Sequence, residues 1–261
     1  MSEVLKALNL QGPQVTALLL VLARLSPLFA IAPLFGSRLL PGRARALCAV
    51  GLAVGLAPVV APHPHEPASV LDLALSMVSE VLVGLAFAFV VAAVFAGVSA
   101  AGALLDGLIG FSFGSLVDPA TGTQASVLSN LYGMVAVLVF IAIGGDAWLI
   151  QGLVRTYAIV PLGRMPSAAA MAAGATHAVG TLFLAAIEVA APVLLALVLT
   201  DAALGVVARA VPQLNVFAVG FPAKIVVGLL VLVAALPFVG GWIGDQVQSS
   251  VASALGALKV G

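Results

Sequence analysis

Long runs of apolar residues, separated by short polar or glycine- and proline-rich stretches, dominate the chain. The runs lie at about residues 15–35, 46–61, 70–100, 124–144, 176–200 and 213–239. Apolar residues follow one another without the two-residue alternation of a half-buried strand, so helices are predicted. Most runs are close to the roughly 20 residues that a helix needs to cross a bilayer. The pattern therefore predicts about six apolar helices in contact with lipid or a large protein assembly.

Several prolines fall in or beside these runs, at Pro27, Pro33, Pro192, Pro222 and Pro237. Proline lacks a backbone N–H and clashes with the preceding turn, so these residues are expected to kink or break the helices. Inside a membrane, the backbone groups freed by such breaks need protein or water as neighbours. Hairpins and broken helices are therefore expected, and not every run is expected to make a simple crossing.

The composition supports a membrane location. Of the 261 residues, 63% are hydrophobic and only 8% are charged, with a mean hydropathy of +1.26. An average soluble domain is roughly 45–50% apolar and about 25% charged. Continuous runs such as MVAVLVFIAI exclude the alternating pattern of a membrane barrel, which leaves helices. The fold class expected is an all-α integral membrane protein, with residues 1–261 as a single membrane-embedded domain.

Several kinds of chemistry are not expected. Ten basic and ten acidic residues cancel, and no block of Lys or Arg indicates binding to nucleic acid. Cys48 is the only cysteine, which excludes an intrachain disulfide, and it is interpreted as a small buried hydrophobe. His63, His65 and Glu66 lie in the proline-rich PHPHEP, without the three or four convergent ligands of a metal site. We expect no metal and no cofactor.

Charged residues inside apolar runs are candidates for function or pairing. They are Arg24, Glu80, Glu188, Asp201 and Lys224. Because an unpaired charge costs several kcal/mol in a membrane, each is expected to act in a proton relay or to pair across helix or subunit contacts. Their scattered positions favour pairing. In GFPAK, Pro222 is expected to bend its helix and turn Lys224 toward a partner subunit, with snorkelling to a headgroup as the alternative.

Residues 110–114, GFSFG, match the G-x-S-x-G nucleophile elbow of α/β-hydrolases. The elbow requires a strand before the serine, followed later by an acid and a histidine. Asp146 and His177 follow in that order, but the preceding VSAAGALLDGLI is typical of a helix. A hydrolase with a Ser112–His177 dyad remains an alternative, and no catalytic residue is assigned.

The same stretch favours a non-helical loop that could close a pore. Glycines weaken a helix here, Asp118-Pro119 breaks it, and TGT at residues 121–123 supplies turn residues. Such backbone is tolerated at membrane depth only when it is buried in protein or lines an aqueous path, which its apolar side chains could obstruct. The predicted plug residues are Gly110, Phe111, Ser112, Phe113, Gly114, Leu116, Val117, Asp118 and Pro119.

Three stretches together carry a family resemblance: GFSFGSLVDPATG, VLSNLYGMVAVLVFIAIGGDAWLI and VPQLNVFAVGFPAKIVVG. They closely resemble the FliR family of flagellar type III secretion export-gate proteins and its injectisome counterpart of the SctT type. The resemblance runs from RLSPLFAIAPLFG to PFVGGW in the same order and spacing.

The resemblance implies a non-enzymatic subunit of an export gate in the bacterial inner membrane, at the flagellar basal body. One such subunit would join several FliP-like and FliQ-like subunits in a helical arrangement, with a FlhB-like protein on the cytoplasmic side and membrane lipid as a further partner. Unfolded export substrates would pass through the pore, driven by energy supplied elsewhere. The plug loop of the family maps onto about residues 110–122. A virulence-system export component is the first alternative.

An ion-coupled secondary transporter is the second alternative. It would use Glu80, Glu188 or Lys224 for coupling and a broken helix at residues 107–119 as its binding site. Transporters of this kind show internal repeats, and no convincing inverted pair is found in the sequence.

Overall fold

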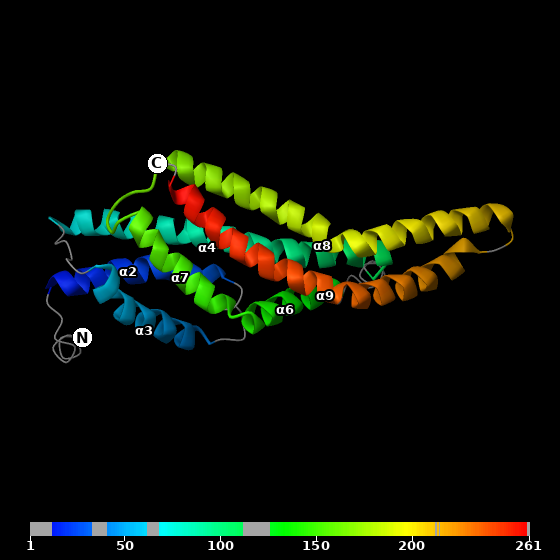
Figure 1. The fold of residues 1–261 in the computed structure, drawn as a ribbon, viewed down its shortest axis with the longest axis horizontal. Coiled ribbons are helices and arrows are strands. Elements are labelled where there is room, and N and C mark those ends of the chain that lie inside the picture. Colours follow the sequence, from blue (N-terminus) through cyan, green and yellow to red (C-terminus); the bar gives the residue numbers. More distant parts are fainter. Residues whose placement is uncertain are drawn as a thin grey trace, which may run out of the picture. The chain divides into compact units, whose positions relative to one another are not determined.

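A computed structural model describes residues 12–32, 41–61, 68–111, 126–211, 213 and 215–259. These residues form α-helices and no strand (Figure 1). In chain order the helices are α2 (Gly12–Ile31), α3 (Gly42–Val60), α4 (Val70–Ile109), α6 (Val127–Ala142), α7 (Gly145–Ile159), α8 (Ala168–Ala210) and α9 (Val216–Lys259). Five are long and apolar enough to cross a membrane, and α6 with α7 passes the same test as a bent pair. The prediction of an all-α membrane protein is confirmed.

Helices α4, α8 and α9 are much longer than the apolar runs that predicted them. Helix α4 continues to Ile109, past the expected end at about residue 100, and α9 continues to Lys259 instead of about residue 239. A helix of mixed composition, α7, was missed altogether, because it includes Asp146, Gln151 and Arg155. Polar residues can continue a helix wherever the backbone bonds are satisfied, so hydropathy alone underestimates helix length.

Proline does not break these helices. Pro27 lies inside α2, Pro192 inside α8, and Pro222 and Pro237 inside α9. The expectation of breaks is wrong at these four positions, since losing one backbone donor leaves the rest of the hydrogen-bond ladder in place. The expected kinks stay a prediction, and Pro33 lies outside the described residues.

The sharp break between α6 and α7 occurs at a glycine. Gly144 has φ +68°, a left-handed conformation that favours glycine, and precedes the first residue of α7. Across this short break α6 and α7 are bent by 75°. Such a pair is a broken span or a re-entrant loop, which accounts for a segment that does not make a simple crossing.

The chain folds into two compact units built from interleaved segments. Unit 1 takes the described residues of 1–92, 144–178 and 248–261, and unit 2 takes those of 93–143 and 179–247. Helices α4, α8 and α9 each contribute residues to both units. The single-domain organisation expected from the sequence stays a prediction.

In unit 1, α3 packs along α2 and leaves most of its own surface open. Cys48 is exposed on α3, so its interpretation as a buried hydrophobe is wrong. The reason is that α3 packs against few neighbours in this chain, so an apolar run here does not imply burial.

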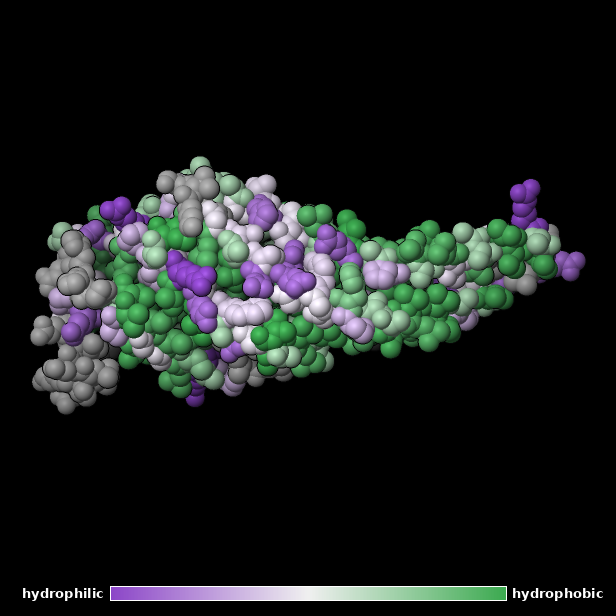
Figure 2. Space-filling model, in the orientation of Figure 1, coloured by the Kyte–Doolittle hydropathy of each residue, from purple (hydrophilic) through white to green (hydrophobic). Residues whose placement is uncertain are grey.

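In unit 2, α8 and α9 form a long antiparallel hairpin (Figure 1). Phe95 of α4 meets Phe140 of α6 edge to face, with ring centroids 5.4 Å apart. The hairpin surface is largely hydrophobic, as Figure 2 shows. Its exposed side chains include Phe183, Leu195, Val206, Leu230 and Val233. A surface of this kind is expected to contact lipid or other subunits.

Candidate functional site

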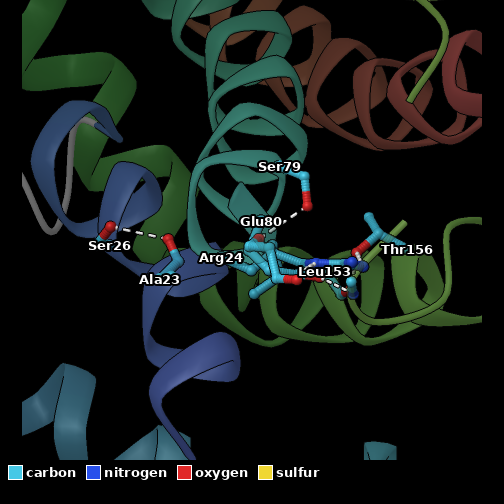
Figure 3. A network of polar contacts seen from close by, with 9 residues as sticks. Ala23, Arg24, Ser26, Ser79, Glu80, Leu153 and Thr156 are labelled. Atoms are coloured by element: carbon cyan, nitrogen blue, oxygen red, sulfur yellow. Dashed lines mark hydrogen bonds and ion pairs between the residues drawn. The ribbon is translucent and has the colours of Figure 1, made fainter. Parts of the chain in front are cut away.

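A buried ion pair joins α2 to α4 in unit 1. Arg24 Nε lies 2.5 Å from Glu80 Oε2, and both side chains are fully buried. The two residues are 56 positions apart in the chain, and Figure 3 shows them meeting in the middle of a polar network. Of the charges found in apolar runs, these two are therefore paired within one chain.

The network extends from this pair to α7 and the turn that follows it. Arg24 Nη1 donates to Thr156 Oγ1 at 3.2 Å, and Thr156 in turn donates to the Leu153 carbonyl at 2.6 Å. The guanidinium carbon of Arg24 lies 4.1 Å from the centre of the Tyr157 ring, a cation–π contact. The backbone N–H of Gly163 donates to Glu80 Oε1 at 2.8 Å. The two carboxylate oxygens of Glu80 therefore link α4 to α2 and to the turn after α7.

Close helix packing surrounds the pair. A Cβ added to Gly84 of α4 would lie 2.0 Å from the carbonyl oxygen of Arg24, so no other residue fits without moving α2. One turn before Gly84, Glu80 reaches the side chain of the same arginine. The missing side chain at residue 84 and the carboxylate at residue 80 therefore act together, one allowing close approach and the other neutralising the buried charge.

The charges of unit 2 are arranged differently. Lys224 Nζ lies 2.6 Å from Asp201 Oδ1 across the α8–α9 hairpin, with side chains 25% and 53% exposed. Glu188 is exposed and accepts a hydrogen bond from Trp242 Nε1 at 2.8 Å. Pro222 lies within the continuous α9, two residues before Lys224. A contact of Lys224 with a partner subunit stays a prediction, because the structure gives it a partner in its own chain.

Most of the predicted plug lies outside the described residues. Helix α4 ends at Ile109, and Gly110 follows with φ +104°, a conformation that L side chains rarely adopt. Phe111 is partly exposed. Ser112, Phe113, Gly114, Leu116, Val117, Asp118 and Pro119 are not described.

The two described ends of this connection lie close together. The Asp106 carboxylate near the end of α4 accepts from the backbone N–H of Leu128, in the first turn of α6, at 3.4 Å. A Cβ on Gly102 would lie 2.4 Å from the Leu128 carbonyl oxygen. The chain from residue 110 to residue 126 therefore leaves and returns to nearly the same place, where a connection of a few residues would suffice.

The nucleophile-elbow hypothesis loses the structural context that it requires. The residues before Gly110 belong to the 40-residue helix α4, as the sequence predicted, and not to a strand. In the described part of the chain no group of three or more His, Cys, Asp or Glu side chains could hold a metal. His63, His65 and Glu66 lie outside that part.

Sequence reasoning missed several members of the buried network. Thr156, Tyr157 and Gly163 lie in or just after α7, a segment without an apolar run. Nothing in their spacing relates them to residues 24 or 80, since the contacts arise from chain segments far apart in sequence. A buried arginine on an apolar helix was the available signal, because such a group needs several acceptors or an aromatic face.

The model of the family "Bacterial export proteins, family 1" matches residues 15–250. The chain is 32% identical over 218 residues to the "Flagellar biosynthetic protein FliR" of Escherichia coli (strain K12), covering 84% of this chain and 83% of that protein. It is 33% identical over 226 residues to the protein of the same name from Bacillus subtilis (strain 168), with 84% and 86% covered. It is 26% identical over 213 residues to the "Surface presentation of antigens protein SpaR" of Shigella sonnei, with 81% and 82% covered.

Proposed function

Because the chain belongs to the bacterial export protein family 1, we propose that it is a membrane subunit of a flagellar type III protein-export gate. The observation that carries this proposal is the match over residues 15–250, together with about one-third identity to flagellar biosynthetic proteins. The relatives named SpaR are less similar, at 26% identity. The flagellar system is therefore favoured over an injectisome, and the cell inner membrane is the location proposed.

The fold supports a structural role more than an enzymatic one. Arg24, Glu80 and Thr156 are fully buried, and their polar contacts tie α2, α4 and α7 together. The hairpin of unit 2 exposes a large apolar surface. We assign the buried network to holding unit 1 rigid and the hairpin surface to contacts with FliP-like and FliQ-like subunits. A FlhB-like protein is the proposed partner on the cytoplasmic side.

The family's plug is assigned to residues 110–122. This stretch joins α4 to α6, whose described ends meet where Asp106 accepts a hydrogen bond from the backbone N–H of Leu128. It begins with a glycine at φ +104° and a partly exposed phenylalanine. Glycines permit backbone conformations closed to other residues, and phenylalanine side chains exclude water, two properties suited to obstructing a resting pore.

The flagellar role is tested by deleting the gene in the bacterium that carries it. We expect loss of swimming and of flagellar hook-protein export, both restored by the wild-type gene, with co-purification of FliP-like and FliQ-like proteins from the membrane. If virulence effectors stop being secreted and swimming continues, the protein serves an injectisome. If the protein instead purifies as a monomer that transports or hydrolyses a substrate on its own, both the flagellar and the injectisome assignments are wrong.

The plug is tested by its effect on leakage. Deleting residues 112–121, or replacing Phe111 and Phe113 with glycine, should raise the conductance of the purified complex in bilayers while assembly survives. Ser112→Ala is the matched control, since its hydroxyl is given no catalytic role, and it should leave conductance and export near normal. Wild-type conductance after the deletion would make the loop a simple connector.

A further inference from the structure

A pocket of about 460 Å³ opens in unit 1 between α7 and the end of α9. One wall comes from Trp148, Gln151 and Arg155 of α7. The other comes from Gln248 and the residues that follow it on α9, as far as Gly256. Figure 1 shows these two segments side by side, and Gly152 at the pocket lies so close to Val251 that a Cβ would approach it to 2.6 Å. The pocket therefore flanks a tight helix crossing.

The lining residues repeat at helical spacing on both walls. On α7 they are residues 148, 151, 152 and 155, and on α9 they are residues 248, 251, 252, 255 and 256. Positions three and four apart share one face of a helix, so each wall is a single continuous stripe. We call the apolar or small lining residues the floor and the polar ones the rim: the floor is Gly152, Val251, Ala252, Leu255 and Gly256, and the rim is Trp148, Gln151, Arg155 and Gln248. A ligand with both an apolar and a polar part fits such a site.

The rim supplies hydrogen-bond donors in excess. The Arg155 guanidinium has five N–H donors and no acceptor, the Trp148 indole has one donor, and the two glutamines add amide donors. None of these four side chains has a hydrogen bond or ion pair to another residue in the described part of the chain. No carboxylate lines the pocket. The chemistry selects an anionic group that accepts hydrogen bonds and carries no cation of its own.

The position of the pocket indicates where such an anion comes from. It lies in the last turns of the candidate membrane-spanning stretch of α9, Ala218–Gly256, after the polar residues of that helix have begun. Tryptophan and arginine gather where an apolar span reaches the headgroup layer. Arginine binds phosphate through two parallel hydrogen bonds.

We propose that this pocket binds the phosphate of an anionic phospholipid, with Arg155 as the main ligand and the acyl chains leaving over the apolar floor. Trp148 and the glutamines complete the phosphate and glycerol contacts. A zwitterionic headgroup is disfavoured, because its ammonium group would find no carboxylate here. The site fixes α7 to α9 through a lipid and is independent of the export role.

The test uses the full chain purified in detergent and examined by native mass spectrometry after adding dimyristoyl-phosphatidylglycerol. Two variants disrupt the pocket in different ways. Arg155→Gln removes the cation, whereas Gly256→Leu fills the pocket at a position where a Cβ meets nothing within 4 Å. Arg155→Gln should weaken the affinity for the lipid by about tenfold, the loss expected for a charge-assisted contact. Gly256→Leu should lower the fraction of protein with one bound lipid by occupying the space that the lipid needs.

Matched controls keep the outcome interpretable. Arg164→Gln removes an exposed arginine of unit 1 that does not line the pocket, and Gly241→Leu adds the same side chain to α9 at another open position. Both should bind the lipid as the wild type does. Since the two site variants perturb different atoms, failure of one to fold leaves the other as a test. Equal lipid retention by site and control variants would overturn the proposal.

Competition identifies the ligand. Dimyristoyl-phosphatidylcholine and dimyristoylglycerol should displace the bound phosphatidylglycerol poorly, because the first carries an unmatched cation and the second lacks phosphate. Millimolar inorganic phosphate should compete weakly, since it lacks the apolar part. If phosphate alone binds at the Arg155-dependent site, or if phosphatidylcholine binds equally well, the assignment to an anionic lipid is wrong.

Discussion

The two ion pairs, one in each unit, differ in how far they are buried. In unit 1, Arg24 and Glu80 are fully buried, and hydrogen bonds, an aromatic face and a helix crossing surround them. In unit 2, Asp201 and Lys224 form a single partly exposed contact on an apolar hairpin. A buried pair depends on both members, because removing one leaves a charge without solvent. An exposed pair contributes little to stability, because water screens both charges.

Helix α4 contributes residues to both units and has different surroundings in each. Helix α4 carries Glu80, one member of the buried pair, in unit 1, and Asp106, which accepts a hydrogen bond from α6, in unit 2. In the first it is locked from several sides, and in the second it leads into the connection proposed as the plug.

Removing Glu80 should have the largest effect. Glu80→Ala leaves Arg24 buried and unneutralised, and we expect a loss of about 3–5 kcal/mol of stability. For a chain of this size that corresponds to a fall in melting temperature of roughly 10 °C, measured by circular dichroism in detergent. Glu188→Ala is the control, because its carboxylate is exposed and accepts one hydrogen bond. If the two variants lose equal stability, the buried carboxylate of unit 1 matters no more than the exposed carboxylate of unit 2.

The double variant Arg24→Met/Glu80→Met sharpens this result. With both charges replaced by apolar side chains, no buried charge is left over, and most of the stability lost in Glu80→Ala should return. The Gly163 N–H loses its acceptor, but that residue is exposed and can bond to water. A double variant as unstable as Glu80→Ala would mean that the network matters for more than charge pairing.

Gly84→Ala should have the next largest effect. Its methyl group cannot fit 2.0 Å from the Arg24 carbonyl oxygen, so α2 must move, at a cost of about 1–3 kcal/mol. Gly51→Ala on α3 is the matched control, because a Cβ there meets nothing within 4 Å and alanine favours a helix by roughly 0.5–1 kcal/mol. The melting temperatures should therefore move in opposite directions. A shift of the same sign for both would show that the crossing is loose.

Lys224→Met should change the stability of the isolated chain least, by under about 1 kcal/mol, because its ion pair is partly exposed. Its effect should instead appear in assembly, as a lower yield of the complex with FliP-like and FliQ-like subunits in pull-down. Arg209→Met, in the last turn of α8, removes a comparable charge as the control. An unchanged complex would favour a lysine that snorkels to a headgroup.

The sequence by itself determined the fold class and the family. Apolar runs of membrane length require helices, because no other element of this pattern satisfies its backbone in lipid, and the motifs around residues 110–122 and 211–228 carry the family resemblance. It also identified Arg24 and Glu80 as charges that need partners. Helix ends and α7 were missed, because hydropathy is insensitive to polar residues that continue a helix.

Only the tertiary structure decided which partners those charges have. Arg24, Glu80 and the segment that holds Thr156 and Gly163 are separated by dozens of residues, and no local spacing relates these three parts of the chain. The same holds for Gly84, whose place at a helix crossing depends on the path of α2. Local sequence specifies helices through backbone hydrogen bonds, whereas burial and pairing depend on how whole helices pack, and that is a property of the assembled chain.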